Sequence, residues 1–130
     1  MSIQQQLLLA IVEQGGYPDF TPLYESLGYR VIIAPSMRKA LGLLKQHTPD
    51  VITAEFIYSP MYSARISNLE SLFAALQSQQ INPLLCIFVD REQVHHLNKL
   101  AMYHSEFRKI TYPITSGKLV NFLREQMTTS

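Results

Sequence analysis

The sequence predicts an α/β fold, a three-layer sandwich around a five-stranded parallel sheet. Apolar runs recur five times along the chain, and segments with a helical period separate them. Runs that are apolar on both faces are typical of parallel strands covered by helices on both sides. Five such units are too few for an eight-fold barrel and favour an open sheet with right-handed crossovers. The 130 residues are enough for one core, so we expect a single domain over residues 1–130.

Each strand is expected where an apolar run rich in Leu, Val or Ile is bounded by turn residues. The first run is followed by Gly15-Gly16 and Pro18. The second run ends at Pro35, and the fifth and shortest ends at Pro113. The predicted strands cover residues 7–12, 30–34, 51–57, 84–89 and 109–112.

Helices are expected between the strands, where apolar residues repeat every three or four positions. The first has the weakest pattern, and we expect it to begin at Thr21-Pro22 and to end at Gly28. The expected N-caps of the other four are Ser36, Ser67, Asp90 and either Thr115 or Ser116. Their inward-facing stripes are Met37, Ala40, Leu41, Leu43 and Leu44; Ile66, Leu69, Leu72, Phe73 and Leu76; Val94, Leu97, Leu100 and Ala101; and Leu119, Val120, Leu123 and Met127.

Composition and charge argue against several classes of protein. A hydrophobic content of 47% is too high for intrinsic disorder, and a net charge of +1 without one basic run disfavours nucleic-acid binding. The longest apolar run, residues 7–12, is far shorter than the ~20 residues that span a bilayer. Cys86 is the one cysteine and cannot form an internal disulfide, which fits a reducing compartment. We therefore expect a cytoplasmic protein that binds neither nucleic acid nor membrane.

Four short motifs resemble those of the receiver domain of bacterial response regulators, in the same order along the chain. Leu27-Gly28-Tyr29 resembles the Gly-aromatic turn after the first helix of that family. Thr48-Pro49-Asp50 resembles the segment that leads into its third strand, and Pro83-Leu84 the start of its fourth. Tyr112-Pro113-Ile114 is similar to the Lys-Pro element after its fifth strand. The resemblance covers nearly the whole chain and implies a flavodoxin-like strand order, 2-1-3-4-5.

The resemblance also implies a phosphorylation site, and the chain departs from its pattern at each position. A working receiver holds Mg²⁺ with acidic residues after the first strand and accepts a phosphoryl group on an Asp after the third. A Ser or Thr on the fourth strand and a Lys on the fifth stabilise the phosphoryl oxygens. The corresponding positions here are Glu13 and Gln14, Glu55, Phe88 and Tyr112. The resemblance therefore implies a degenerate pseudo-receiver that is not phosphorylated efficiently.

Glu55 has two interpretations at this stage. In the first, its additional methylene carries the carboxylate to the place of an aspartyl phosphate and holds an active-like state. In the second, Glu55 is a polar residue at a strand end that faces solvent or pairs with a basic neighbour. We favour the second, because Phe88 and Tyr112 replace the groups that would sense the added charge.

The segment after the third strand is longer and more aromatic than its receiver counterpart. It lies at the carboxyl edge of the predicted sheet, where open α/β folds bind ligands. Glu13, Glu55, Tyr58, Tyr62 and Arg65 are therefore candidates for a pocket that takes a planar or anionic ligand. The interpretation we favour is that the loop only covers the strand ends.

No metal ion or cofactor is predicted from the motifs. Gly15-Gly16 follows the first strand but lacks the rest of a phosphate-binding motif. Glu92 and His96 are four residues apart and make half of a metal site, which no Cys/His cluster completes. We interpret them as surface residues.

The last third of the chain holds a candidate interface made of Met102, Tyr103, Phe107 and Phe122, which the inward stripes do not all require. In receivers the face formed by the fourth helix, fifth strand and fifth helix mediates dimerisation and output contacts. The preferred function is therefore a non-enzymatic protein-interaction module in bacterial signalling, with an unidentified protein partner or a homodimer through that face. The alternative is a small-ligand sensor or minor enzyme that uses the carboxyl-edge pocket, and a receiver phosphorylated on Glu55 comes last.

Overall fold

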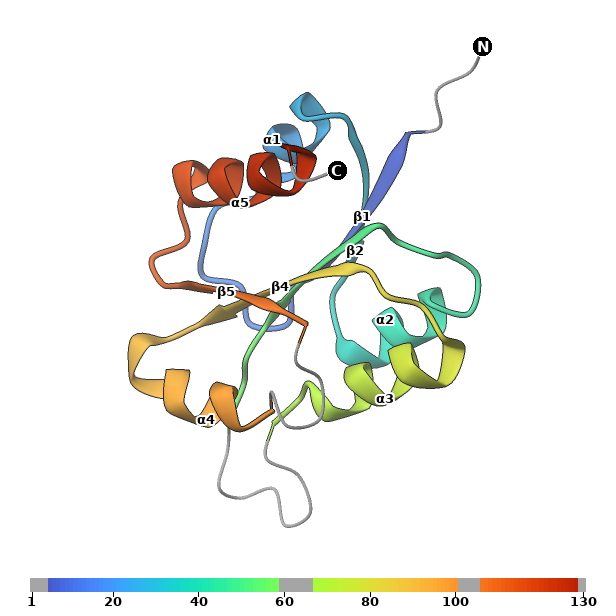
Figure 1. The fold of residues 1–130 in the computed structure, drawn as a ribbon, viewed down its shortest axis with the longest axis vertical. Coiled ribbons are helices and arrows are strands. Elements are labelled where there is room, and N and C mark those ends of the chain that lie inside the picture. The colour runs from blue at the N-terminus through green and yellow to red at the C-terminus, as the bar shows by residue number, and fades with distance from the viewer. Residues whose placement is uncertain (1–4, 59–66, 101–105, 129–130) are drawn as a thin grey trace.

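The computed structural model describes residues 5–58, 67–100 and 106–128, and for residues 126–128 the backbone alone. Strands and helices alternate along these residues (Figure 1). The strands are β1 (Gln6–Ile11), β2 (Tyr29–Ala34), β3 (Val51–Glu55), β4 (Leu84–Val89) and β5 (Arg108–Thr111). The helices are α1 (Thr21–Ser26), α2 (Met37–Leu43), α3 (Glu70–Gln79), the short 3₁₀ helix η1 (Arg91–Gln93), α4 (Val94–Lys99) and α5 (Ser116–Thr128).

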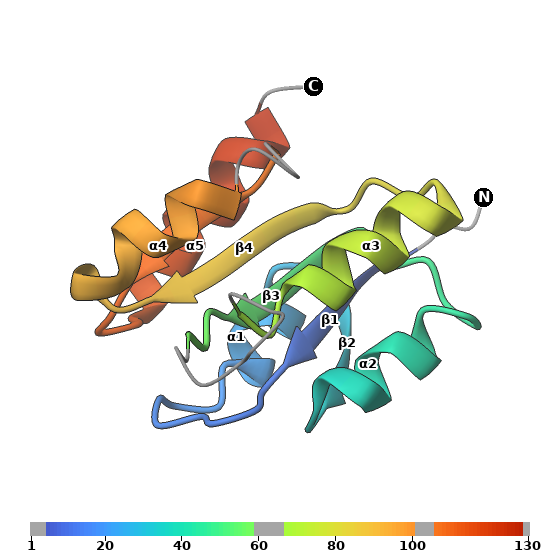
Figure 2. The ribbon, with the colours of Figure 1, turned by 90° about the horizontal axis from the view of Figure 1, so that it is seen from below.

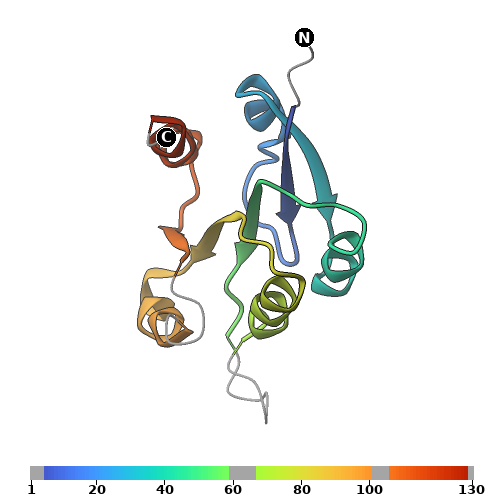
Figure 3. The same ribbon diagram turned by 45° about the vertical axis from the view of Figure 1, so that its right-hand side comes forward.

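The five strands form one parallel sheet in the order β2-β1-β3-β4-β5, which confirms the predicted strand order. Helices α1 and α5 cover one face of this sheet, and α2, α3 and α4 cover the other (Figures 1 and 3). Figure 2 shows the carboxyl ends of β1, β3 and β4 at one edge, where the loop after β1 also lies. In the register of the sheet, Glu55 of β3 stands opposite Phe88 of β4.

The core divides into two layers because successive strand residues point to opposite faces. On β1, Leu9 and Ile11 pack with α2, α3 and α4, whereas Leu8 and Ala10 pack with α1 and α5. All four side chains are buried, which explains why the run is apolar at every position.

The strand starts are held together by the Pro-Asp motif. The backbone of Asp50 exchanges hydrogen bonds with Leu7 and Leu84, through Leu7 O at 2.8 Å and Leu84 N at 2.9 Å. The carboxylate of Asp50 accepts a further bond of 2.8 Å from the Leu7 N–H. The segment that resembles the receiver approach to the third strand therefore joins β1, β3 and β4 at their amino ends.

Two of the expected N-caps are confirmed. The Ser36 hydroxyl accepts a hydrogen bond from the Lys39 N–H at 3.1 Å, and the Thr115 hydroxyl accepts one from the Lys118 N–H at 3.3 Å. Gly28 follows α1 with φ +98°, a conformation in which a side chain is strained.

The other two caps are wrong. Helix α3 begins at Glu70, because Ser67 instead forms an antiparallel bridge with Tyr58 and its hydroxyl accepts from the Leu69 N–H at 3.1 Å. Asp90 precedes η1, and its backbone carbonyl, not its side chain, accepts from the Gln93 N–H at 2.8 Å. Strand β3 also ends two residues before the predicted end, because the Ile57 N–H donates to Asn68 Oδ1 at 2.8 Å.

Within the described ranges, no helix has both the length and the apolar character that a membrane crossing requires.

Candidate functional site

Glu55 ends β3 at the carboxyl edge of the sheet, and its side chain is 1% exposed. Its Oε1 accepts a hydrogen bond of 2.8 Å from the Gln14 N–H. Its Oε2 accepts one of 3.2 Å from the Gly15 N–H and one of 2.6 Å from the Tyr17 hydroxyl. The expectation that Glu55 faces solvent is therefore wrong, because the carboxylate turns inward to the loop after β1.

The loop after β1 is shaped to present its N–H groups to that carboxylate. The Val12 N–H still bonds Ala34 O at 2.9 Å, and the chain then turns away from the sheet. Gly15 and Gly16 have φ of +70° and +87°, in the left-handed region that favours glycine. The glycine pair thus permits a turn whose backbone donors close on Glu55.

Aromatic rings fill the space beside the Glu55 carboxylate. The Tyr17 ring meets Phe88 edge-on, with ring centroids 5.2 Å apart, and lies 6.3 Å from both Phe20 and Tyr112. Phe88 is 1% exposed, so a buried ring stands where the resemblance implies a hydroxyl. Tyr112 is half-buried and stands where it implies an ammonium.

Burial and the neighbouring carboxylate hold these two phenols in their protonated form. Burial, followed by the hydrogen bond to Glu55, raises the pKa of Tyr17 well above its usual value. Burial, followed by the negative charges of Glu55 and Asp90, raises the pKa of Tyr112 to about 12. At neutral pH Tyr17 is therefore a hydrogen-bond donor to Glu55.

Asn68 links the two glutamates of the site. Its Nδ2 donates to Glu13 Oε1 at 2.6 Å and to the backbone oxygen of Glu55 at 2.8 Å. The Gln14 side chain is exposed, and the residue contributes its backbone N–H to Glu55. The sequence reasoning missed Asn68 and Tyr17, because each reaches the site from a segment that carries no recognisable motif.

The expected carboxyl-edge pocket is brought together in part. Tyr62 and Arg65 lie outside the described residues. Tyr58 packs away from Glu55, with its ring stacked 3.9 Å from the His96 ring and 6.3 Å from the Phe56 ring. Partial burial, followed by the positive charges of His95 and Lys99, lowers the pKa of His96. Glu13 and Glu55 therefore share Asn68, while Tyr58 belongs to a contact with α4.

A cavity of about 170 Å³ lies beside the Glu55 site, between α1 and the sheet, and sequence reasoning did not identify it. Tyr17 and Phe88 belong both to its wall and to the aromatic group around Glu55. Its lining comes from β1, β2, β3, β4, α1 and the loop before α1, so no local pattern could have indicated it.

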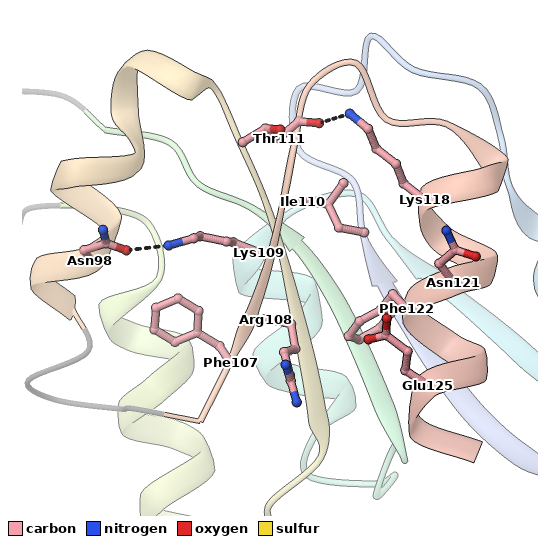
Figure 4. Close-up of a pocket in the computed structure, with 10 residues that line it drawn as sticks. All are labelled: Asn98, Phe107, Arg108, Lys109, Ile110, Thr111, Lys118, Asn121, Phe122 and Glu125. Carbon is pink, nitrogen blue, oxygen red and sulfur yellow. Dashed lines mark hydrogen bonds between the residues drawn. The ribbon is translucent and has the colours of Figure 1, made fainter. Parts of the chain in front are cut away.

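A wider groove of about 680 Å³ runs along α4, β5 and α5 (Figure 4). Lys109 Nζ donates to Asn98 Oδ1 at 3.0 Å across one side of it. Lys118 Nζ donates to the backbone oxygens of Thr111 and Pro113, both at 2.9 Å, and fixes the turn between β5 and α5. The groove is lined by Asn98, Phe107, Arg108, Lys109, Ile110, Thr111, Lys118, Asn121, Phe122 and Glu125.

Of the four candidate interface residues, the two that the structure describes are not exposed apolar side chains. Met102 and Tyr103 lie outside the described residues. Phe122 is 7% exposed and packs into the core under α5. Phe107 is half-buried and stacks on Phe73 with centroids 6.1 Å apart. The described part of this face is instead a groove with mostly polar sides.

Three or more His, Cys, Asp or Glu side chains do not gather as a possible metal site anywhere in the described ranges. Burial raises the pKa of the Cys86 thiol, and the side chain is inaccessible, as predicted for a small apolar residue in β4.

No family model and no curated protein matches the sequence. Solved structures do match it, and several of them are response-regulator receiver domains. The receiver domain of the Francisella response regulator 1452 is 20% identical, with a TM-score of 0.62, 96% of this chain covered and 100% of that one. A CheY-like receiver domain protein from Methanospirillum hungatei JF-1 is 15% identical, with a TM-score of 0.73 and coverages of 95% and 94%.

A third match is the response regulator receiver protein from Sinorhizobium medicae WSM419, which is 14% identical with a TM-score of 0.70 and covers 98% of both chains. At such low sequence identity, similarity to solved structures establishes the fold alone. The chain has the flavodoxin-like fold of CheY-like response-regulator receiver domains.

Proposed function

We propose that this chain is a receiver-like signalling module that takes no phosphoryl group and acts by binding a protein partner. The receiver fold supports a role in signalling. The rest of the proposal rests on the carboxyl edge of the sheet and on the groove along α4, β5 and α5.

The observation that carries the proposal is the engagement of the Glu55 carboxylate. A phosphoryl acceptor needs an oxygen lone pair that the donor can reach in line. Both oxygens of Glu55 instead accept hydrogen bonds inside the protein, and the side chain is 1% exposed. Phe88 and Tyr112 supply neither the hydroxyl nor the ammonium that would stabilise the transferred group.

The residues present also do not fit the Mg²⁺ ion that working receivers use. Mg²⁺ requires several oxygen ligands in octahedral geometry. Glu13 Oε1 is bonded to Asn68, and the Glu55 oxygens are bonded to the loop after β1. A metal would have to compete with these bonds at both carboxylates.

Phosphorylation is tested with acetyl phosphate and Mg²⁺, with intact mass spectrometry as the readout and a phosphorylatable receiver as the positive control. We expect the unmodified mass under conditions that label the control. An adduct on the wild-type protein that disappears in Glu55→Gln would overturn the proposal. An adduct that persists in Glu55→Gln would also overturn the proposal and would show that another residue accepts the phosphoryl group.

The partner is expected to present acidic side chains to the groove. Arg108, Lys109 and Lys118 line it against one acidic residue, Glu125, so the lining carries a net charge of about +2. Arg108 and Lys109 are exposed, and complementary charge increases the rate and specificity of association. The same charge disfavours a second copy of this groove as its occupant.

The test uses Arg108→Glu, with Arg30→Glu as the matched control, since Arg30 is an exposed arginine on β2 at the opposite edge of the sheet. We expect Arg108→Glu to weaken binding of an acidic peptide, poly-glutamate, at low salt, and Arg30→Glu to leave it unchanged. Equal binding by both variants would contradict the proposal. Light scattering on the same samples measures the oligomeric state. If the wild type and Arg30→Glu are dimers and Arg108→Glu is a monomer, the occupant of the groove is a second copy of the chain and not an acidic partner.

A further inference from the structure

The cavity between α1 and the sheet has the build of a small-molecule site, which goes beyond the proposed function. Its volume is about 170 Å³, and apolar cavities of ~150 Å³ take up benzene. The walls include the rings of Tyr17, Phe20 and Phe88, and Ala10 leaves room at the level of the sheet. A flat apolar molecule can therefore contact aromatic faces and edges on several sides.

Two hydroxyl groups give this apolar cavity a polar point. Thr53 and Tyr24 line it, each is 3% exposed, and the Thr53 side chain lies close enough to the Tyr24 hydroxyl to act against the rise that burial causes in its pKa. Two hydroxyls together hold two donors and four lone pairs, so a donor and lone pairs remain for a third group. A few placed polar groups in an otherwise apolar pocket are typical of ligand sites.

The charge of the lining selects against anions. Among the lining residues, Asp19 is the one charged side chain, and its carboxylate accepts from the Thr21 N–H at 2.9 Å. The lining holds no basic residue that would bind a phosphate or carboxylate.

The mouth of the cavity exposes apolar surface. Ile33 of β2 lines it and is 48% exposed, the one large hydrophobic side chain so exposed in the described ranges. A ligand that covers Ile33 removes this surface from water, which favours binding.

We propose that this cavity binds a small neutral aromatic molecule, of one ring or two fused rings, with one hydroxyl or amine that bonds the Thr53–Tyr24 pair. The ligand contacts the ring of Tyr17, whose hydroxyl holds Glu55 and with it the loop after β1. A ligand in the cavity is therefore expected to change the environment of the Gln14 and Gly15 N–H groups, because they donate to the same Glu55 carboxylate.

The test is a titration of the ¹⁵N-labelled protein with phenol and with indole, followed by amide chemical shifts. We expect saturable shifts at Thr53 and Phe88, and at Gln14 and Gly15 beyond the cavity. Benzoate, a ring of similar size that carries a carboxylate, is expected to bind at least tenfold more weakly than phenol. Absence of saturable shifts with both neutral probes, or benzoate binding as tight as phenol, would overturn the proposal.

Two variants with matched controls locate the binding. Ile33→Trp covers the mouth with a larger ring and is expected to weaken phenol at least tenfold, whereas Arg30→Trp on the same strand leaves affinity unchanged. Thr53→Val removes one hydroxyl at constant shape and is expected to weaken phenol about fivefold, the effect of one hydrogen bond. Its control is Thr48→Val, at an exposed threonine. Wild-type affinity in Ile33→Trp places the probe elsewhere and overturns the assignment, even if Thr53→Val does not fold.

Discussion

The hydroxyl of Tyr17 donates a hydrogen bond of 2.6 Å to Oε2 of Glu55 and so joins the loop after β1 to the end of β3. Glu55 is buried, and its described donors are this hydroxyl and the N–H groups of Gln14 and Gly15. A buried carboxylate is costly unless hydrogen bonds replace its hydration. Glu55, at the position where the receiver resemblance implies a phosphoryl acceptor, is therefore a link between two segments of the fold.

Removal of the Tyr17 hydroxyl tests that link. Tyr17→Phe keeps the ring against Phe88 but leaves Glu55 Oε2 with one fewer donor. We expect the free energy of unfolding to fall by about 2 kcal/mol, since bonds to charged groups are among the stronger ones. Urea unfolding of the wild type and the variant measures this difference.

A double-mutant cycle assigns the loss to the pair. Tyr17→Phe in a Glu55→Gln background removes the same hydroxyl when no carboxylate faces it. We expect a coupling free energy of about 1 kcal/mol or more between the two positions. Additive effects would show that Tyr17 stabilises the fold through its ring alone.

The raised pKa of Tyr17 predicts a loss of stability in alkali. An unfolded phenol has a pKa of about 10, so above that pH the unfolded chain loses its proton first while the folded protein retains it. The stabilisation is complete below pH 10 and falls as the pH rises toward the folded value. Tyr112, with its pKa of about 12, behaves in the same direction.

The loss of unfolding free energy that Tyr17 causes in alkali is the difference between the wild type and Tyr17→Phe. Between pH 8 and pH 11 the wild type should lose about 1 kcal/mol more of its unfolding free energy than the variant does, a value kept low because the Tyr17 side chain is half-exposed. Urea unfolding at the two pH values measures it. Lysines and the remaining tyrosines titrate in both proteins and cancel in the difference, so equal losses would contradict the prediction.

The central strands could be predicted from the sequence because β1, β3 and β4 are buried on both faces. The order of the strands was instead implied by the receiver resemblance, and the sheet confirms it. Burial makes residues 7–11 of β1 and every position of β4 apolar, and such runs are visible without a structure. The ends of elements were less predictable, since they depend on tertiary bonds. Asn68 takes the N–H of Ile57 and so ends β3 early, and Ser67 pairs with Tyr58 instead of capping α3.

The candidate site was predictable at the level of positions but not of contacts. Glu55 and Phe88 stand opposite each other at the edge of the sheet, where the receiver resemblance places the phosphorylation site. The direction of the Glu55 side chain depends on donors 38 to 41 residues away, which no local pattern reveals. Gly15-Gly16 is the available signal, and on its own it predicts a turn but not the direction of the Glu55 side chain.

The Asp50 carboxylate is expected to stabilise the amino ends of the strands. Asp50→Ala leaves the Leu7 N–H, now bonded at 2.8 Å, without its side-chain acceptor. We expect a loss of about 1 kcal/mol in unfolding free energy, measured by thermal or urea unfolding. Asp90→Ala is the matched control, because the Asp90 side chain makes no capping bond to η1, and it should change stability by less than about 0.5 kcal/mol. Equal losses of unfolding free energy in the two variants would show that the Asp50 carboxylate does not stabilise the amino ends of the strands.

We expect the Asn68 side-chain amide to stabilise the fold, because its Nδ2 donates to both the Glu13 carboxylate and the backbone oxygen of Glu55. Asn68→Asp keeps an acceptor for the Ile57 N–H but replaces the Nδ2 donor by an oxygen, which then faces Glu13 Oε1 and the backbone oxygen of Glu55. Repulsion and two lost bonds predict a decrease of about 2 kcal/mol in unfolding free energy at neutral pH.

Asn82→Asp makes the same chemical change at an exposed site and is the control. Asn82 Nδ2 also donates to a glutamate, Glu106, at 3.2 Å, but both side chains are in solvent. Water and salt screen the new pair there, so we expect a change below about 0.5 kcal/mol. Urea unfolding of both variants at the same salt concentration measures the two changes. Equal decreases in unfolding free energy in the two variants would show that the loss comes from the added negative charge on the whole protein. The hydrogen bonds of Asn68 to Glu13 and Glu55 would then make no separate contribution to stability.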